Sequence, residues 1–119
     1  MQIFQPDILP LNIAIIRASE LESKKSEFTD EDGNDVELPK GSLGCVFRGY
    51  HNKHCYSIIV FSSRPTSDII VHEAFHSACD LLENIGIHYD RFGSNEIFAY
   101  TLQYIVRCIN QTIEKESWE

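Results

Sequence analysis

The chain has 119 residues, of which 43% are apolar and 11% aromatic, and its formal net charge is −8. This length and composition predict one folded domain over residues 1–119 and exclude a disordered segment. Acids outnumber bases and no basic stripe is present, so we expect neither nucleic acid nor a membrane surface as a partner. The sequence shows no apolar run of membrane-spanning length and no secretory signal, which predicts a cytoplasmic protein.

The first third of the chain predicts one strand, one short helix and a loop. The segment 11–18 (LNIAIIRA) has the apolar, β-branched composition of a strand. Ser19 and Glu22 then form a capping-box signature for a short helix. The acidic stretch 28–41 is rich in turn-forming residues and should be an exposed loop or hairpin tip.

A β-hairpin follows this loop. The segments 44–50 and 55–63 are rich in β-branched and aromatic residues, and the polar sequence HNKH separates them. We expect His51 and His54, at the tip, to be solvated rather than functional. Together with the first strand, the hairpin predicts a small mixed β-sheet over about residues 11–63.

The second half of the chain has the 3.6-residue period of amphipathic helices. Pro65 and the candidate N-cap residues directly after it indicate the start of a helix, and Gly86 indicates its end. Together they predict a helix over about 67–85. A second helix runs over about 94–114 from a Ser94 cap. The fold class is therefore α+β, a small sheet followed by two helices. The apolar band predicted for the first helix comprises Val71, Phe75, Ala78, Cys79, Leu82 and Ile85.

Two histidines stand four residues apart in the first predicted helix, within the sequence HEAFH at 72–76. At 100° per residue, His72 and His76 lie about 40° apart and one turn along the same helix face. Their imidazoles can direct ring nitrogens at one zinc ion, while Glu73 projects from the neighbouring flank and can reach a water on the metal. This is the HExxH pattern of two zinc ligands and a general base. Because the HExxH pattern also arises by chance, the prediction of a zinc site needs a third ligand elsewhere in the chain.

Glu96, twenty residues after His76, is the candidate third ligand. On its own, an acid in the first turn of a helix is more simply explained as a solvated side chain whose negative charge stabilises the N-terminus of the helix. The segment 87–95, however, is long enough to return the chain to the level of the histidines, at about 3.3 Å per residue. Two antiparallel helices would then present His72, His76 and Glu96 to Zn²⁺ and leave a fourth position for water.

The motif at 72–76, followed by Asn95 and Glu96, resembles that of the gluzincin metallopeptidases. Thermolysin-like members carry HExxH and then an NExx segment that bears the third ligand. The short chain is similar to the minigluzincins, which consist of little more than a sheet and two helices around the zinc. For the site, the resemblance implies Glu73 as base and proton shuttle, and as zinc ligands His72, His76 and Glu96. For the fold, it implies that one hairpin strand, within 55–63, forms the rim along which an extended peptide lies.

Two positions depart from the family pattern. Thermolysin-like enzymes have an aspartate four residues after the glutamate ligand that orients the first histidine, and this chain has Tyr100 there. The Tyr100 hydroxyl or Asp80 can supply that contact instead. Larger gluzincins also stabilise the oxyanion with a histidine from a second lobe, which has no counterpart in these 119 residues. The candidate replacements are His88, Tyr89 and Tyr100.

We therefore expect a zinc metallopeptidase that hydrolyses peptide bonds in a peptide or protein substrate, with Glu73 as general base. Two alternatives remain. ImmA/IrrE-like regulatory metalloproteins also have HExxH followed by a glutamate with an alanine three residues on, as Glu96 and Ala99 are here, and would act on one partner. The other alternative is a non-catalytic zinc-binding interaction module. Cleavage of many different proteins would favour the peptidase, and action on a single substrate would favour the regulatory metalloprotein. Bound metal without any turnover would favour the zinc-binding interaction module.

Overall fold

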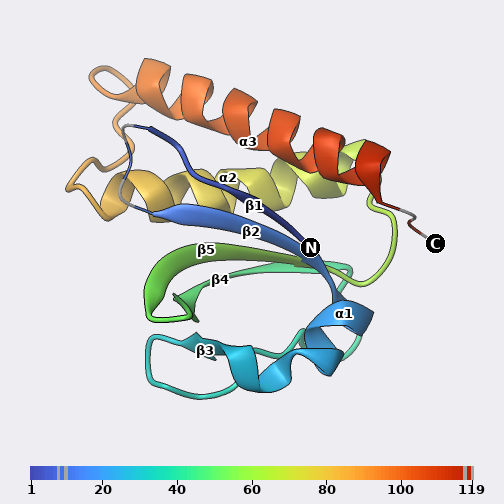
Figure 1. Ribbon diagram of the computed structural model, residues 1–119. Coiled ribbons are helices and arrows are strands. Elements are labelled where there is room, and N and C mark those ends of the chain that lie inside the picture. The colour runs from blue at the N-terminus through green and yellow to red at the C-terminus, as the bar shows by residue number, and fades with distance from the viewer. Residues whose placement is uncertain (8, 10, 117, 119) are drawn as a thin grey trace.

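The structure is a computed structural model that describes residues 1–7, 9, 11–116 and 118 (Figure 1). About 40% of the chain is helix and 25% is strand, which confirms the predicted α+β class. In the described part of the chain, no helix is long and apolar enough to cross a membrane. The elements, in chain order, are β1 (Gln2–Phe4), β2 (Asn12–Arg17), α1 (Ala18–Ser23), the 3-10 helix η1 (Lys25–Glu27), β3 (Phe28–Asp30), β4 (Gly44–His51), β5 (His54–Phe61), α2 (Ser67–Glu83) and α3 (Asn95–Lys115).

The five strands form one sheet in the order β1-β2-β5-β4-β3. β2 and β5 are parallel, and the other neighbouring pairs are antiparallel. The predicted hairpin is β4 and β5, and positive φ angles at Asn52 and Lys53 give its two-residue connection the geometry of a type I′ turn. The mixed sheet predicted for 11–63 is confirmed, and the unpredicted strands β1 and β3 form its two edges. β3 lies within the stretch 28–41 that was predicted as an exposed loop or hairpin tip, and the burial of Phe28 and Val36 corrects that prediction. The two long helices lie within two residues of their predicted bounds.

The prediction that the strand within 55–63 forms a substrate rim is wrong. β5 is an inner strand, because it pairs with β2 on one side and with β4 on the other. β3 pairs only with residues 49–51 of β4, so residues 44–48 have no strand on their outer side in the described part of the chain. Both hairpin strands have similar apolar compositions. Their order in the sheet is set by the long-range pairing of β2 with β5, which the local sequence does not show.

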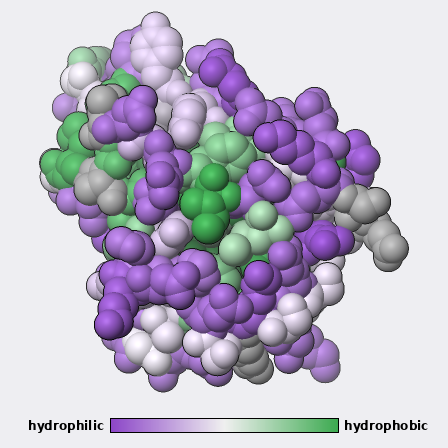
Figure 2. All heavy atoms as spheres, viewed as in Figure 1, coloured by the Kyte–Doolittle hydropathy of each residue, from purple (hydrophilic) through white to green (hydrophobic). Residues whose placement is uncertain are grey.

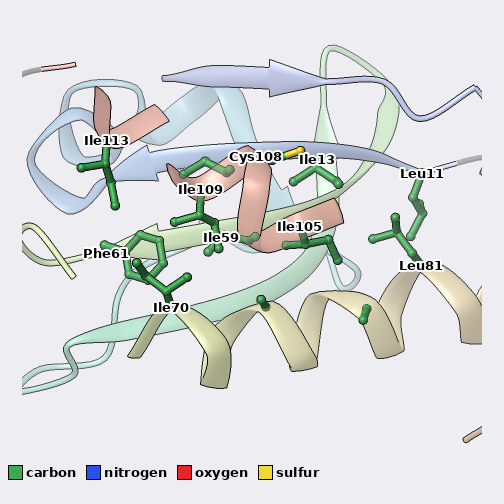
Figure 3. Packing of buried hydrophobic residues seen from close by; sticks show 13 residues of the cluster. Leu11, Ile13, Ile59, Phe61, Ile70, Leu81, Ile105, Cys108, Ile109 and Ile113 are labelled. Carbon is green, nitrogen blue, oxygen red and sulfur yellow. The ribbon is translucent and has the colours of Figure 1, made fainter. Parts of the chain in front are cut away.

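One face of the sheet carries α2 and α3, and the larger core lies between the helices and the sheet (Figures 1 and 3). On the opposite face a smaller core forms, in which Leu21 of α1 and Val36 pack with apolar side chains of the sheet, Phe28 of β3 among them. Because both faces of β2 and β5 are covered, their apolar runs are continuous rather than alternating. The side chains that meet in the larger core include Ile13, Ile59 and Phe61 from the strands, Ile70 and Leu81 from α2, and Ile105, Ile109 and Ile113 from α3.

The buried face of α2 is rotated from the predicted apolar band. Ala78 and Leu82 are buried as predicted, but Val71 is 48% and Phe75 41% exposed. The small side chain of Ser77 lets α2 approach the sheet closely, and its hydroxyl oxygen lies 2.7 Å from that of Ser57 in β5. Hydrophobic periodicity missed this rotation because two residues on the buried face are polar. That face comprises Ile70, Glu73, Ala74, Ser77, Ala78, Leu81 and Leu82.

His51 is buried, which corrects the prediction that it is solvated. It is 6% exposed, and its ring stacks on Phe28 with a centroid separation of 4.5 Å. Strand β3 places Phe28 directly opposite His51, and this cross-strand contact is not visible in the local sequence. His54, on the other side of the turn, is exposed as predicted.

Candidate metal centre

Helix α2 sets the positions of the HExxH side chains. The helix starts at Ser67, after Thr66 in an extended conformation (φ −80°, ψ 165°). Pro65 disfavours helical backbone in the residue before it, so the helix cannot readily extend further toward the hairpin. His72 and His76 are both exposed, one turn apart, whereas Glu73 turns toward the sheet and is buried.

The imidazole rings of His72 and His76 converge. Their Nε2 atoms are 3.3 Å apart, and the ring planes meet at 77°. Two histidine nitrogens bound to a tetrahedral zinc at 2.0–2.1 Å each would be about 3.3–3.4 Å apart. The observed separation therefore fits a shared zinc ion, and without an ion it permits one hydrogen bond between the rings. A carboxylate oxygen of Glu73 and one nitrogen of each histidine lie within 4.8 Å of one another.

Glu73 is a buried acid without a hydrogen-bond partner for one of its oxygens. The side chain is 5% exposed, and its Oε2 makes no hydrogen bond to the described residues. Leaving a buried polar atom unsatisfied costs about 1–3 kcal/mol. A water or a cation at this position would recover that free energy, so the carboxylate is suited to a site that holds one of them.

Gly44 in β4 makes room for Glu73. A Cβ atom at this glycine would lie 3.0 Å from Cγ of Glu73 and 3.1 Å from Cδ1 of Phe61. Sequence reasoning missed Gly44, although a glycine within a strand is a signal for close approach by another group. An open cleft of about 440 Å³ lies beside this contact and is lined by Leu43, Gly44, Asp68, Ile69, His72 and Glu73.

Gly44→Ala should displace Glu73 from its position. The added methyl group would stand closer to Glu73 and Phe61 than side chains normally tolerate, so we expect a destabilisation of about 1–3 kcal/mol from overpacking. If Glu73 is the catalytic base, zinc content should be retained while peptide turnover falls about tenfold or more, since small misplacements of a catalytic group are costly. Denaturant unfolding, metal analysis and turnover measure the three effects. Ser42→Ala, which precedes β4, is the control, and equal turnover in both variants would contradict the positional role of Gly44.

Glu96 lies outside the cluster formed by His72, Glu73 and His76. It is in the first turn of α3, and its side chain is exposed. Its position relative to the histidines depends on residues 84–94 and on the packing of α3, which the spacing in the sequence does not fix. Glu96 lines a second pocket, of about 290 Å³, together with Phe75, Tyr89, Asn95, Phe98, Ala99 and Leu102.

Asp80, one of the two residues predicted to orient a histidine, interacts with the sheet. Its Oδ2 accepts a hydrogen bond of 3.4 Å from Ser57, and its Oδ1 lies 3.7 Å from a guanidinium nitrogen of Arg48. Burial raises the pKa of Asp80, and the positive charge of Arg48 partly offsets that effect. Arg48 also donates a hydrogen bond of 3.1 Å to the Asp80 carbonyl oxygen. These contacts join α2 to β4 and β5 one turn beyond His76.

None of the other residues considered for supporting roles is among those that line the cleft beside Glu73. Tyr100 is 68% exposed and lines a separate pocket between α3 and the N-terminal segment. Tyr89 packs edge-on against Phe98, with ring centroids 5.4 Å apart, in the pocket that contains Glu96. His88 is exposed. Their predicted roles in orienting a ligand or stabilising an oxyanion stay predictions.

Comparisons with known proteins add no relative. No protein-family model matches the chain, and no curated protein or solved structure is significantly similar to it. Any proposal for the function of this protein therefore rests on the motif and on the geometry described above.

Proposed function

We propose that this protein is a zinc-dependent peptidase of the gluzincin type. One observation carries the proposal: the converging nitrogens of His72 and His76 lie beside the buried Glu73, one of whose carboxylate oxygens has no partner among the described residues. A solvated helix face would account for two exposed histidines. It would not account for an acid that is withdrawn from water while one of its carboxylate oxygens has no hydrogen-bond partner among the described residues, because such burial is unfavourable.

In this proposal His72 and His76 hold Zn²⁺, and Glu96 of α3 is the third ligand. Two imidazoles and one carboxylate form a donor set that catalytic zinc sites use. When bound, zinc supplies a Lewis acid that polarises the scissile carbonyl and lowers the pKa of water to about 7.

Glu73 is the general base. Its carboxylate takes a proton from the attacking water and passes it to the leaving amine. The side chain lies against Gly44 and lines the same cleft as His72. This packing restrains the carboxylate, so little free energy is spent on orienting it when a substrate binds.

The free edge of β4 supports a peptide as the substrate. Leu43, just before β4, accepts a backbone hydrogen bond from Ser62. Successive residues of a strand point their backbone N–H and C=O groups alternately toward and away from an antiparallel neighbour. Since Leu43 bonds to the β5 side, Gly44 and Val46 direct their N–H and C=O groups away from β5. An extended peptide can pair with these groups as an additional strand, and Gly44 places that edge directly beside Glu73.

A non-catalytic zinc-binding module is the second candidate, and the position of Glu96 favours it. The described cluster contains two histidines and Glu73 but not Glu96. If Glu96 does not join the histidines on a bound ion, Glu73 itself becomes the nearest carboxylate ligand, and the site then has no free base.

Metal analysis of the chain purified without added zinc, combined with digestion of a mixture of unfolded proteins, distinguishes these candidates. The peptidase should contain about one equivalent of zinc and cleave the mixture. Cleavage should stop with a chelator and resume when zinc is restored. Bound zinc without cleavage would support the module, and the absence of any zinc affinity would contradict both candidates.

A further inference from the structure

The cleft beside Glu73 has a second acidic side chain in its lining. Asp68, in the first turn of α2, lines it together with His72 and Glu73, and the described lining residues include no lysine or arginine. Asp68 is exposed, and it takes part in none of the ion pairs among the described residues. Its Oδ1 accepts a hydrogen bond from the Thr66 hydroxyl, which lowers the pKa of Asp68 below its ordinary value. The cleft therefore contains an ionised carboxylate that a cationic group can approach.

The charge of Asp68 is not needed to balance the proposed metal centre. Glu73 lines the same cleft, is 5% exposed, and its Oε2 has no hydrogen-bond partner among the described residues. In the proposed centre, the carboxylates of Glu73 and Glu96 match the two positive charges of a zinc ion. Asp68 is then the acid of the cleft lining whose charge is left over for a substrate.

The position of Asp68 places this charge close to the reacting groups. Asp68 precedes His72 by four residues, so the two lie about 40° apart around α2 and about 6 Å apart along it. Leu43 and Ile69 add apolar surface to the same cleft. Lysine and arginine suit such a surface, because their methylene stems cover apolar groups while the charged head reaches an acid. The lining also includes Gly44 at the start of β4, so a peptide paired with the free edge of β4 lies beside this cleft.

We propose that Asp68 forms an acidic subsite that selects a lysine or arginine side chain of the peptide substrate close to the scissile bond. The inference rests on the proposed peptidase function and adds the substrate class. Because Asp68 is exposed, the ion pair should give a modest preference, about threefold to fivefold in kcat/KM for lysine over an uncharged chain of the same length. Repulsion of a substrate glutamate adds to this difference, so lysine should exceed glutamate by about tenfold.

The overall charge of the protein also attracts cations. The net charge is −8, and hydrophilic side chains cover most of the face drawn in Figure 2. A field of this kind favours any cationic peptide, wherever its charge stands in the sequence. Glu83→Gln separates this effect from the subsite. Glu83 is an exposed acid at the end of α2 and is absent from the cleft lining, so its substitution removes one charge without altering the cleft.

Digestion of a random peptide library by the zinc-loaded full chain at low salt, with sequencing of the products, tests the proposal. One position near the cleaved bond should be enriched about threefold to fivefold in Lys and Arg, and about 0.5 M salt should reduce the enrichment. Asp68→Asn removes the charge but retains an oxygen for the Thr66 hydroxyl, so the enrichment should disappear while zinc content stays the same. Asp68→Lys should replace it with an enrichment in Glu and Asp. Glu83→Gln should keep the enrichment of the wild type.

A binding measurement separates recognition from hydrolysis. Two peptides that differ only in lysine or norleucine at the enriched position are titrated into zinc-loaded Glu73→Gln. The lysine peptide should bind about threefold to fivefold more tightly, and Asp68→Asn in that background should remove the difference.

Three results would overturn the subsite and leave the peptidase function intact. They are cleavage without enrichment in Lys and Arg, an enrichment that survives Asp68→Asn, and an enrichment that Glu83→Gln removes as completely as Asp68→Asn does. A zinc-loaded wild-type chain that cleaves no library peptide would overturn the peptidase function and the subsite with it.

Discussion

Glu73→Gln should retain zinc and thermal stability while peptide turnover falls by a factor of about 10² or more, because the amide cannot accept the water's proton at neutral pH. The substitution preserves the size of the side chain, and its amide NH2 can take the position of Oε2, which has no hydrogen-bond partner among the described residues. No protein contact is therefore lost. Metal content, the unfolding temperature and turnover of one defined peptide measure the three expectations in the same preparation.

The matched control for this variant is Glu83→Gln. Glu83 is an exposed acid near the end of the same helix, so its substitution changes the net charge equally without touching the cleft. It should leave turnover unchanged. Turnover in Glu73→Gln equal to that of the wild type would contradict the role of Glu73 as base and support a metal-binding module.

His72→Ala should abolish stoichiometric zinc binding, with an affinity loss of at least about 100-fold, because one of two converging nitrogens is removed. Glu96→Gln should have a smaller effect of the same kind. The amide oxygen is a weaker ligand than a carboxylate, so zinc affinity should fall while excess metal restores activity. Titration with zinc against a competing chelator gives both affinities.

His54→Ala controls for the general effect of removing a histidine, since His54 is exposed at the hairpin turn and outside the cluster. Its zinc content should equal that of the wild type. If Glu73→Gln lost zinc while Glu96→Gln kept it at full affinity, the roles of ligand and base would be exchanged. That result is physically reasonable for this site, because Glu73 rather than Glu96 belongs to the described cluster.

The sequence predicted the features that depend on local signals. The helices around the HExxH motif and around Ile105 and Ile109 were identified from periodicity and from the residues that end helices, and their bounds agree with α2 and α3. The convergence of His72 and His76 also follows from the sequence alone. Any regular α-helix places residues four apart on one face, whatever the helix packs against.

Long-range packing decided the rest of the candidate site. Which hairpin strand forms the free edge depends on the pairing of β2 with β5, and the exposure of Phe75 depends on the side of α2 that meets the sheet. The buried Glu73 packs tightly against Gly44, which is 29 residues earlier in the chain and in another element. A single sequence carries no direct record of such contacts, because they depend on the relative orientation of elements whose local patterns are compatible with several arrangements. The HExxH spacing therefore identified His72 and His76 as candidate metal ligands, whereas only the tertiary structure decided that Glu73 is withdrawn from water beside them and that Glu96 lies on the neighbouring surface.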